Sequence, residues 1–518
     1  MLTTLLSRLP LAPALRKRWG LDDNELCFMQ FARARRAQAP RPQAPAGRSV
    51  LVQMPNDYFY LCLFFTATQA LGGTSNRLTG LWHQNIMSAP RGEGSQGLRR
   101  LLRRVFNALD RMKWQTLYAS TGVQAFCSLE VGLVQAWKNW RQGQQIWRQL
   151  TSKDDLLALS LHGTPCGDLV YDTYLRYRVQ ATVDVRDTFL RTVIVQALNA
   201  QCAMRRLLKR GAFDTFLTSY SSYVQHGMPV REALRAGVAV YAAGNLSQYF
   251  KRLSMDDSLH AAAHWRYRAQ FDVLADPQAA QTLAREQLEN RFKGAIDRAT
   301  LYMKTSAYGS GSGSMPPGVE GVVFLHDFFD SPHCYRNMLF PDFLEWARFT
   351  LQVVESEALP IAFKPHPNQL PESAVVVEAL KREFPTVTWL DPKLSNHAIF
   401  QSGIRCGISV YGTILHELAY LGIPALSAGD HPHVAFDIAT TPYSIAAYRK
   451  GLVDFRSIAL PADVKTQVLN FYYMHNVFDK EDLPVDWGQM NMRALEQSDS
   501  VALPKFMAMY AAHGSRAP

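Results

Sequence analysis

The chain has 518 residues, a hydrophobic fraction of 47% and a formal net charge of +11. This length exceeds what one hydrophobic core usually serves, so we expect at least two domains, and the composition excludes a disordered chain. The seven cysteines are scattered and never spaced as CxxC, which argues against a disulfide framework or a structural zinc site. The same cysteine pattern favours a reducing cytoplasm. The sequence also shows neither a secretory signal nor an apolar run of about 18 residues.

The predicted elements divide the chain into five parts. Residues 1–45 are expected to form a flexible basic arm, and residues 46–307 a domain in which long helices decorate a parallel sheet. Residues 308–318 form a Gly/Ser-rich linker or loop. Residues 319–455 are expected to form a doubly wound domain, and residues 456–518 return to helix.

In the first domain, strand and helix patterns alternate irregularly. The expected elements are a strand at 49–54, helices at 58–71, 131–150 and 185–209, a strand at 213–220, a helix at 230–236 and a strand at 238–241.

Basic residues concentrate in the N-terminal half of the chain. Between Leu98 and Leu109, apolar residues recur at helical spacing while arginines occupy the other side. Such a helix can lie on an anionic membrane surface, and it can equally face a core with a solvated basic side. We expect a protein peripheral to the inner membrane. No RNA- or DNA-binding motif accompanies the charge, so no nucleic-acid partner is expected.

In the second domain the alternation becomes regular, and five strands separated by helices predict a doubly wound parallel sheet. The expected strands are 322–325, 360–363, 387–390, 408–410 and 424–427, and the expected helices are 341–355, 372–384, 395–401 and 414–421.

A polar turn follows the second strand of this sheet. There, in Lys364-Pro-His-Pro367, two prolines restrict the backbone around His366. Open α/β sheets bind ligands at the carboxyl ends of their strands. A fixed imidazole beside an ammonium at such an edge can bind a diphosphate or stabilise a departing phosphate. A turn closed by a hydrogen-bonded histidine is the structural alternative.

A second polar segment, Ser409-Val-Tyr-Gly-Thr413, follows the fourth strand. Thr413 is expected to cap the next helix, whose free N–H groups would make an anion site. Glu417 lies about one turn further, where it could bind a ribose hydroxyl pair or a base edge. The alternative for Glu417 is a surface carboxylate favoured by the helix dipole, although its helix is largely apolar.

These two motifs, with Gly429 and His431 beyond them, resemble those of bacterial capsule and surface-polysaccharide glycosyltransferases, in particular the group that includes Kdo transferases. The resemblance covers about residues 320–435. In that group, and in bacterial sialyltransferases with a His-Pro pair, the histidine and a later Ser/Thr pair grip the nucleotide of a CMP-sugar. His366 and Pro367 match the first motif, whereas the serine and threonine of the second segment are not adjacent.

The resemblance implies the GT-B fold, in which two Rossmann-like α/β domains face a cleft. It implies a Leloir-type glycosyltransferase that needs no catalytic metal and no cofactor besides its nucleotide-sugar co-substrate. The sugar would be Kdo or another ulosonic acid from a CMP-sugar, and the acceptor a surface glycan or a lipid-linked molecule of capsule or lipopolysaccharide synthesis. The residues expected to bind the donor are Lys364, His366, Pro367, Ser409, Tyr411, Gly412, Thr413, Glu417 and His431.

Two acidic segments supply candidates for catalysis, because an inverting transferase needs a base for the acceptor hydroxyl. Asp168 is the first choice, since acceptor groups of GT-B enzymes usually come from the N-terminal domain. Asp327 is the second choice, and His366 completes the catalytic set. Each aspartate could instead cap a turn. The residues expected to bind the acceptor are Asp172, Tyr174, Arg176, Tyr220 and His226, the last of which could equally be a buried, hydrogen-bonded histidine.

Rival functions remain open at this stage. A polyol-phosphate transferase that uses a CDP-alcohol would carry histidines at comparable strand ends. A sugar-nucleotide epimerase could use the same fold without an acceptor. A non-catalytic factor of glycan assembly or export would not depend on the strand-end residues at all.

Overall fold

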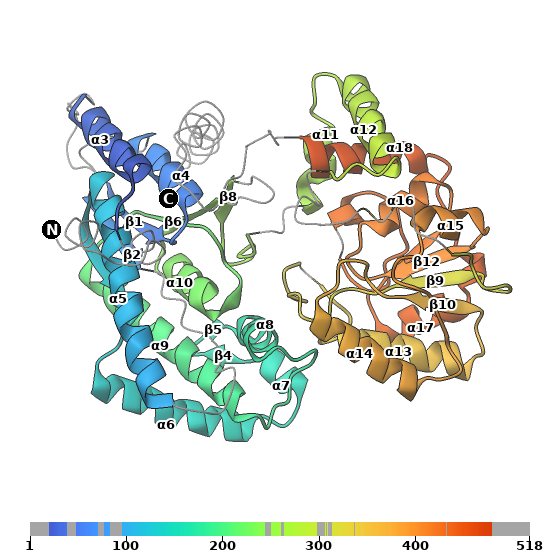
Figure 1. Cartoon of the computed structure of the whole chain (residues 1–518), viewed down its shortest axis with the longest axis horizontal. Helices are drawn as coiled ribbons and strands as arrows, with labels where there is room; N and C mark the ends of the chain where they lie inside the picture. Colours follow the sequence, from blue (N-terminus) through green and yellow to red (C-terminus); the bar gives the residue numbers. More distant parts are fainter. Residues whose placement is uncertain are drawn as a thin grey trace.

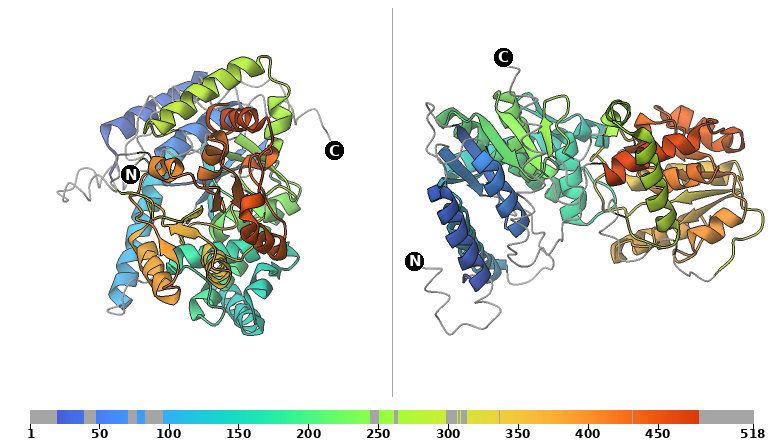
Figure 2. Two further views of the ribbon diagram at one scale, coloured as in Figure 1. Left: turned by 90° about the vertical axis from the view of Figure 1, so that its right-hand side faces the viewer. Right: turned by 90° about the horizontal axis from the view of Figure 1, so that it is seen from above.

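Two β-sheets, each flanked by helices, form two domains that lie side by side (Figures 1 and 2). The expected fold class, α/β with two Rossmann-like domains, is confirmed. The computed structural model of the chain describes residues 20–38, 48–70, 77–82, 96–243, 250–260, 264–297, 306, 308, 313–335, 337–430 and 432–478.

The first domain contains a six-stranded sheet of strand order β3-β2-β1-β6-β7-β8. Its strands run parallel except the edge strand β8, which pairs antiparallel with β7. Val50 of β1 pairs with Leu78 on one side and with Thr215 on the other, so the sheet changes its winding direction between β1 and β6. The strands are β1 Ser49–Met54, β2 Arg77–Trp82, β3 Val123–Ser128, β6 Thr215–Thr218, β7 Ala239–Ala243 and β8 Phe250–Leu253.

The helices of this domain flank the sheet and continue below it in Figure 1 as a helical layer with its own core. Apolar residues of three helices, among them Leu169, Ile194 and Met228, fill that core. The helices are α4 Tyr58–Ala70, α5 Gln96–Ser120, α6 Leu133–Gln149, α7 Lys153–Leu157, α8 Gly167–Arg178, α9 Thr188–Arg210 and α10 Tyr223–Arg235, and a hairpin of β4 Ser160–Leu161 and β5 Thr164–Pro165 precedes α8.

Part of the expected N-terminal arm is ordered as helix α3, Asp23–Gln38. Phe28, Met29 and Ala32 are buried on one face of this helix and pack against the core of the first domain. Glu25 is also buried and is paired with Lys113 of α5 at 2.6 Å. Although this segment is rich in basic residues, one face of its helix is apolar and holds it against the first domain.

The second domain contains a five-stranded sheet of order β11-β10-β9-β12-β13, in which every strand runs parallel to its neighbours. The five strands and the intervening helices confirm the expected doubly wound sheet. The strands are β9 Gly321–Phe324, β10 Ile361–Lys364, β11 Thr388–Trp389, β12 Cys406–Ser409 and β13 Ala425–Ser427, and the helices are α13 Phe343–Ser356, α14 Pro371–Glu383, α15 Asn396–Gln401, α16 Ile414–Tyr420 and α17 Ile445–Val453.

Helices α11, Tyr267–Phe271, and α12, Pro277–Phe292, pack with the second domain although they precede the Gly/Ser-rich segment. Figures 1 and 2 show both beside α18, Val464–Tyr472. Leu288 of α12 and Val468 of α18 belong to one apolar cluster. The expected boundary at 308–318 therefore differs from the structure, because apolar packing rather than chain flexibility decides which domain a helix joins.

None of the helices in the described ranges has the length and apolarity needed to cross a bilayer. The segment 98–109 is helical as part of α5, but its side chains up to residue 106 lie outside the described residues.

Buried polar contacts of α8 connect the first domain to the second. The hydroxyls of Tyr171 and of Thr182, just beyond the helix, both donate to Asp342 Oδ2 at 2.5 Å. The Asp342 side chain is completely buried, and its Oδ1 caps α13 by accepting from the backbone N–H of Glu345 at 2.8 Å. A buried carboxylate is costly unless hydrogen bonds satisfy it, so the second domain depends on donors from the first.

Both ends of α8 are fixed by backbone features. At its start, a Cβ atom on Gly167 would lie 2.2 Å from the carbonyl oxygens of Leu156 and Leu157, so only glycine allows α7 to approach this closely. At its end, Val179 adopts a left-handed φ of 57°, which is unfavourable for a β-branched residue. Val179 and Ala181 pack against the core of the second sheet, and this packing offsets the strain.

Replacing Tyr171 with phenylalanine removes one of the two hydroxyls that donate to Asp342 Oδ2. We expect the free energy of unfolding, measured by urea denaturation, to fall by about 1–2 kcal/mol because a buried acceptor loses a partner. Tyr473→Phe, at a half-buried tyrosine of the second domain whose hydroxyl makes no hydrogen bond to a described residue, is the matched control and should change stability by less than about 0.5 kcal/mol. Equal stabilities of the two variants would contradict this role of Tyr171.

Candidate active site

The carboxyl ends of β9, β10 and β12 open into a cavity of about 740 Å³, here called the large cavity. It lies where the second sheet changes winding direction, and its volume is typical of a ligand site. Arg176 of α8 lines it from the first domain, so the two domains face each other across it and the expected cleft is confirmed. Predicted residues that line it are Lys364, His366, Pro367, Ser409, Tyr411, Gly412, Thr413, Glu417, Asp327 and Arg176.

Lys364 places a buried ammonium group at this edge of the sheet. Its side chain is 3% exposed, and its Nζ donates to Asn396 Oδ1 at 2.7 Å. No carboxylate of the described residues lies within ion-pair distance of it. Burial lowers the pKa of Lys364 to about 8, which the more distant Glu417 and Asp391 offset only in part. A buried cation with this environment favours an anionic ligand.

His366 is held as a neutral hydrogen-bond donor. The backbone N–H of Asn368 donates to its Nδ1 at 3.2 Å, so the neutral ring carries its proton on Nε2. Burial lowers the pKa of His366, the nearby Asp327 carboxylate opposes this shift, and Lys364 adds to it. The ring thus closes the turn through Nδ1 and leaves its Nε2–H group available to a ligand.

His326, two residues after β9, holds the polar segment that follows β12. Its Nε2 accepts from the backbone N–H of Tyr411 at 2.9 Å, and its ring stacks on Phe343 at 4.8 Å. Burial lowers the pKa of His326 to about 3, with a smaller contribution from His366, so this ring stays uncharged. His326 therefore fixes the segment after β12 relative to β9.

The segment after β12 differs in one respect from the expectation. Thr413 makes no side-chain cap on α16, because its backbone is already helical, with φ −57°. Its Oγ1 instead accepts from the Arg291 guanidinium at 3.3 Å. The other hydroxyls are also bound to protein: Ser409 donates to the carbonyl of Phe324 at 3.0 Å, and Tyr411 donates to that of Pro332 at 2.9 Å.

Glu417 is buried and takes part in a charge network with α12. Its Oε1 accepts from Arg291 Nε at 2.7 Å, and its Oε2 accepts from the Tyr308 hydroxyl. Burial opposes ionisation, but the Arg291 guanidinium holds the pKa of Glu417 below its usual value. The carboxylate therefore holds α12 against the large cavity, and contact with a ribose stays a prediction.

Asp327 organises the loop after β9. Its Oδ2 accepts from the backbone N–H of Leu370 at 2.7 Å, and its Oδ1 accepts from the Ser373 hydroxyl at 2.9 Å and from the N–H of Phe329 at 3.0 Å. These bonds attach the loop to the first turn of α14. Both oxygens are thus occupied, which favours the structural interpretation of Asp327 over the catalytic one.

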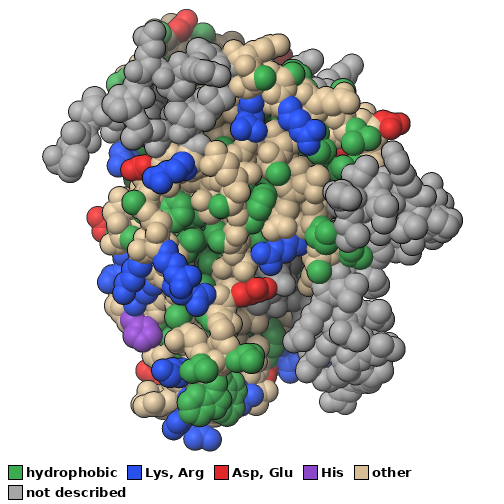
Figure 3. Space-filling model, turned by 90° about the vertical axis from the view of Figure 1, so that its left-hand side faces the viewer, with side chains coloured by type: hydrophobic (Ala, Val, Ile, Leu, Met, Phe, Trp, Pro, Cys, Tyr) green, Lys and Arg blue, Asp and Glu red, His purple; other side chains and the backbone are tan. Residues whose placement is uncertain are grey.

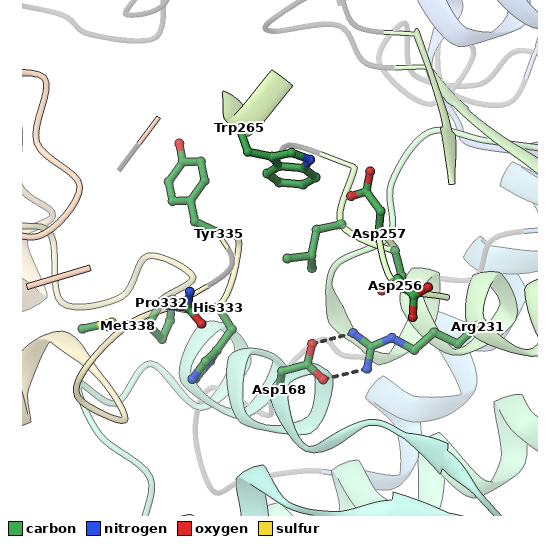
Figure 4. Close-up of a pocket in the computed structure, with 12 residues that line it drawn as sticks. Asp168, Arg231, Asp256, Asp257, Trp265, Pro332, His333, Tyr335 and Met338 are labelled. Carbon is green, nitrogen blue, oxygen red and sulfur yellow. Dashed lines mark hydrogen bonds and ion pairs between the residues drawn. The ribbon is translucent and has the colours of Figure 1, made fainter. Parts of the chain in front are cut away.

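A second, smaller cavity of about 290 Å³ lies between the domains and is here called the small cavity (Figure 4). Trp265 and Tyr335 line it together with the pair Asp168–Arg231. Arg231 binds both oxygens of Asp168 at 2.7 and 2.5 Å, as the dashed lines in Figure 4 show. Although burial opposes ionisation, Arg231 holds the pKa of Asp168 below its usual value. A carboxylate in this state is a weak base, so the geometry disfavours Asp168 as the proton acceptor.

His333 also lines the small cavity and is a stronger candidate for a base. Its Nδ1 donates to Asp172 Oδ1 at 2.6 Å across the domain boundary. Its Nε2 has no hydrogen-bond partner in the part of the chain that the structure describes, and its side chain keeps 17% exposure. Burial lowers the pKa of His333, but the Asp172 carboxylate outweighs this and raises it above the ordinary value. An imidazole oriented by a carboxylate is a common general base.

The other predicted acceptor residues lie elsewhere. Tyr174 is buried in the helical core and donates to Asp187 at 2.9 Å, so it lines neither cavity. His226 pairs with Gln53 of β1 at 2.9 Å, and the Tyr220 ring lies 5.6 Å from His226, at the switch point of the first sheet. His431 lies outside the described residues. No group of three or more potential metal ligands gathers within the described ranges.

Sequence reasoning assigned no role to His333 or Arg231 because each acquires its role from a distant partner. Arg231 lies 63 residues from Asp168, and His333 lies 161 residues from Asp172. The available signal was the density of polar residues in the short segment from His326 to His333, directly after a strand.

No protein-family model and no curated protein sequence matches the chain. Among solved structures, Thermosulfurimonas dismutans KpsC, a beta Kdo 2,7 transferase, is 12% identical, with 58% of this chain and 90% of that chain covered and a TM-score of 0.30. Acinetobacter baumannii MurG is 10% identical, covers 83% of this chain and 95% of that chain, and has a TM-score of 0.24. UDP-GlcNAc 2-epimerase from Neisseria meningitidis is 10% identical, with 83% of this chain and 96% of that chain covered and a TM-score of 0.21. These likenesses carry no information on the reaction.

Lys364 is expected to lose its proton near pH 8 in the ligand-free protein, whereas an ordinary lysine titrates near ~10.4. The ε-carbon resonances of labelled lysines, recorded against pH, would show this midpoint, and Lys364→Met would assign it. Inorganic pyrophosphate should raise the midpoint, because an anion stabilises the ammonium form. A Lys364 resonance that titrates only near ~10.4 without ligand would contradict this environment.

Proposed function

We propose that the protein is a glycosyltransferase that moves a sugar from a nucleotide donor in the large cavity to an acceptor hydroxyl in the small cavity. The observation that carries the proposal is the buried Lys364 ammonium beside the His366 donor, at the strand edge that faces Arg176 of the first domain. The ammonium of Lys364, the Nε2–H group of His366 and the guanidinium of Arg176 suit a phosphate that gains negative charge as it leaves.

The small cavity supports the acceptor half of the proposal. Aromatic walls from Trp265 and Tyr335, together with charged side chains, are typical of a site that binds a sugar ring. The loop of residues 330–335 separates the two cavities and contributes side chains to both. An acceptor in the small cavity would therefore lie beside a donor in the large one.

The reaction would proceed by one displacement. His333 Nε2 removes the proton from the acceptor hydroxyl while the acceptor oxygen attacks the anomeric carbon of the donor. The bond from that carbon to the phosphate oxygen breaks, and the electron pair leaves with the nucleotide. Lys364, His366 Nε2–H and Arg176 stabilise the departing phosphate, and Asp172 stabilises the charged His333 imidazole. This course inverts the anomeric configuration.

The finer assignment follows the motif resemblance and belongs to the same proposal. The donor would be a CMP-sugar of Kdo or another ulosonic acid. The acceptor would be a surface glycan or a lipid-linked molecule of capsule or lipopolysaccharide synthesis, reached at the cytoplasmic side of the inner membrane. Product analysis separates this enzyme from a CDP-polyol phosphotransferase, since only the latter leaves a phosphodiester.

Calorimetric titration with CMP, CDP, UDP and GDP tests the donor site. We expect one of these nucleotides to bind, and Lys364→Met to weaken that binding about 10–100-fold through loss of a charge-assisted hydrogen bond. Binding should also weaken above pH 8, because the Lys364 pKa is about 8 and only the ammonium form pairs with phosphate. Lys393→Met, at an exposed lysine of the same domain, is the control and should bind like the wild type. If the folded protein binds none of these nucleotides, the proposal fails.

The pH dependence of turnover tests the base. The rate should rise with pH through the pKa of His333, which lies above the ordinary histidine value, because only the neutral imidazole accepts a proton. Asp172→Asn should move this rise to lower pH and reduce kcat by a factor on the order of 10²–10⁴. His333→Gln should abolish the rise, whereas Asp168→Asn should retain it. A rise that persists in His333→Gln and disappears in Asp168→Asn would return the role of base to Asp168.

A further inference from the structure

Helix α6 exposes an unusual set of large apolar side chains. Leu133 is 90% exposed, Val134 70%, Trp137 55% and Trp140 47%. Leu133, Trp137 and Trp140 follow one another at helical spacing and therefore lie on one side of the helix, with Val134 adjoining them in the first turn. We call these four residues the α6 apolar face. Two exposed tryptophans on a single helix mark an interaction surface.

Basic residues predominate around the α6 apolar face, and one exposed carboxylate, Glu130, lies three residues before the helix begins. Helix α6 contains Lys138, Arg141 and Arg148, and neither α6 nor α9 contains an acidic residue. The Arg141 guanidinium lies 5.0 Å from the Trp137 ring centroid, so a cation adjoins the apolar face directly. In Figure 3 hydrophobic side chains gather at the lower end of the molecule, where α6 lies, with Lys and Arg side chains beside them.

The C-terminal end of α9 adds further positive charge at the same end of the helical layer. Arg206 donates to the backbone carbonyl of Glu130, three residues before α6 begins, at 2.8 Å. Lys209 and Arg210 follow, and both side chains are exposed. These three residues line a cavity of about 520 Å³ between α6 and α9. Within the described residues none of the three is in an ion pair.

We infer that the α6 apolar face and the cations of α6 and α9 together dock the protein onto an anionic lipid bilayer. The tryptophans and Leu133 enter the interfacial region, where amphipathic aromatic rings are favoured, while the lysines and arginines contact anionic head groups. The absence of acidic side chains from both helices complements a negative surface. This inference names the membrane partner of the proposed enzyme, and its test does not depend on sugar transfer.

Flotation of the full chain with lipid vesicles tests the inference. We expect binding to vesicles of phosphatidylglycerol and phosphatidylethanolamine, and binding at least about tenfold weaker to phosphatidylcholine vesicles or at high salt. Trp137→Ala combined with Trp140→Ala should reduce the partition coefficient about tenfold or more, because the interfacial anchors are lost. Lys209→Gln and Arg210→Gln should each reduce it about fivefold.

Matched substitutions on the second domain serve as controls. Val375→Ser combined with Tyr443→Ser removes apolar side chains that are 68% and 71% exposed, and Lys393→Gln removes an exposed cation. These variants should bind vesicles like the wild type, and circular dichroism and nucleotide titration show whether each variant is folded. Equal vesicle binding by the wild type and the double tryptophan variant overturns the inference, as does a wild type that ignores anionic vesicles. A wild-type dimer that the double substitution dissociates also overturns it, because a second copy would then cover the face.

Discussion

The buried contact between α8 and the second domain is the constraint on which the rest of the site depends. Consecutive residues of this helix, Tyr171 and Asp172, bond to Asp342 and His333 of the other domain. Both carboxylates are almost fully buried, so neither can lose its partner without a large desolvation cost. The contact thus sets the orientation of the domains. It also raises the pKa of His333, which lies between the two cavities.

The same contact explains why similar side chains acquire different chemistry in this site. Asp168 and Asp172 lie one turn apart on α8, yet Asp168 is held by a guanidinium while Asp172 orients an imidazole. Asp168 is thereby kept ionised and weakly basic, whereas Asp172 raises the pKa of His333 and makes that imidazole a stronger base. Histidines differ likewise: His326 is a neutral structural acceptor, whereas His366 offers an N–H group to the large cavity.

Local features of the chain were predictable from the sequence, and long-range ones were not. The five strands of the second sheet and the polar turns at Lys364 and after Ser409 follow from periodicity, proline placement and the rule that ligands bind at strand ends. The cap at Thr413 was predicted wrongly, because the Thr413 backbone is already helical, and its hydroxyl oxygen accepts instead from Arg291, 122 residues away. The interpretation of Asp168 as a base could not anticipate Arg231. A buried charge pairs with residues that only folding brings close, and these lie too far away in the sequence for a local pattern to indicate them.

The packing of α12 against α18 determines how the chain can be divided. A fragment that starts after the Gly/Ser-rich segment would lack Phe271, Ala284 and Leu288, whose apolar partners on α18 would then face water. It would also lose Arg291, leaving the buried Glu417 carboxylate without its cation. A fragment of the second domain therefore keeps its apolar cluster and its buried ion pair only when it includes α11 and α12. The Gly/Ser-rich segment is therefore not the point at which the chain can be cut, because the packed core of the second domain begins with the helices that precede it.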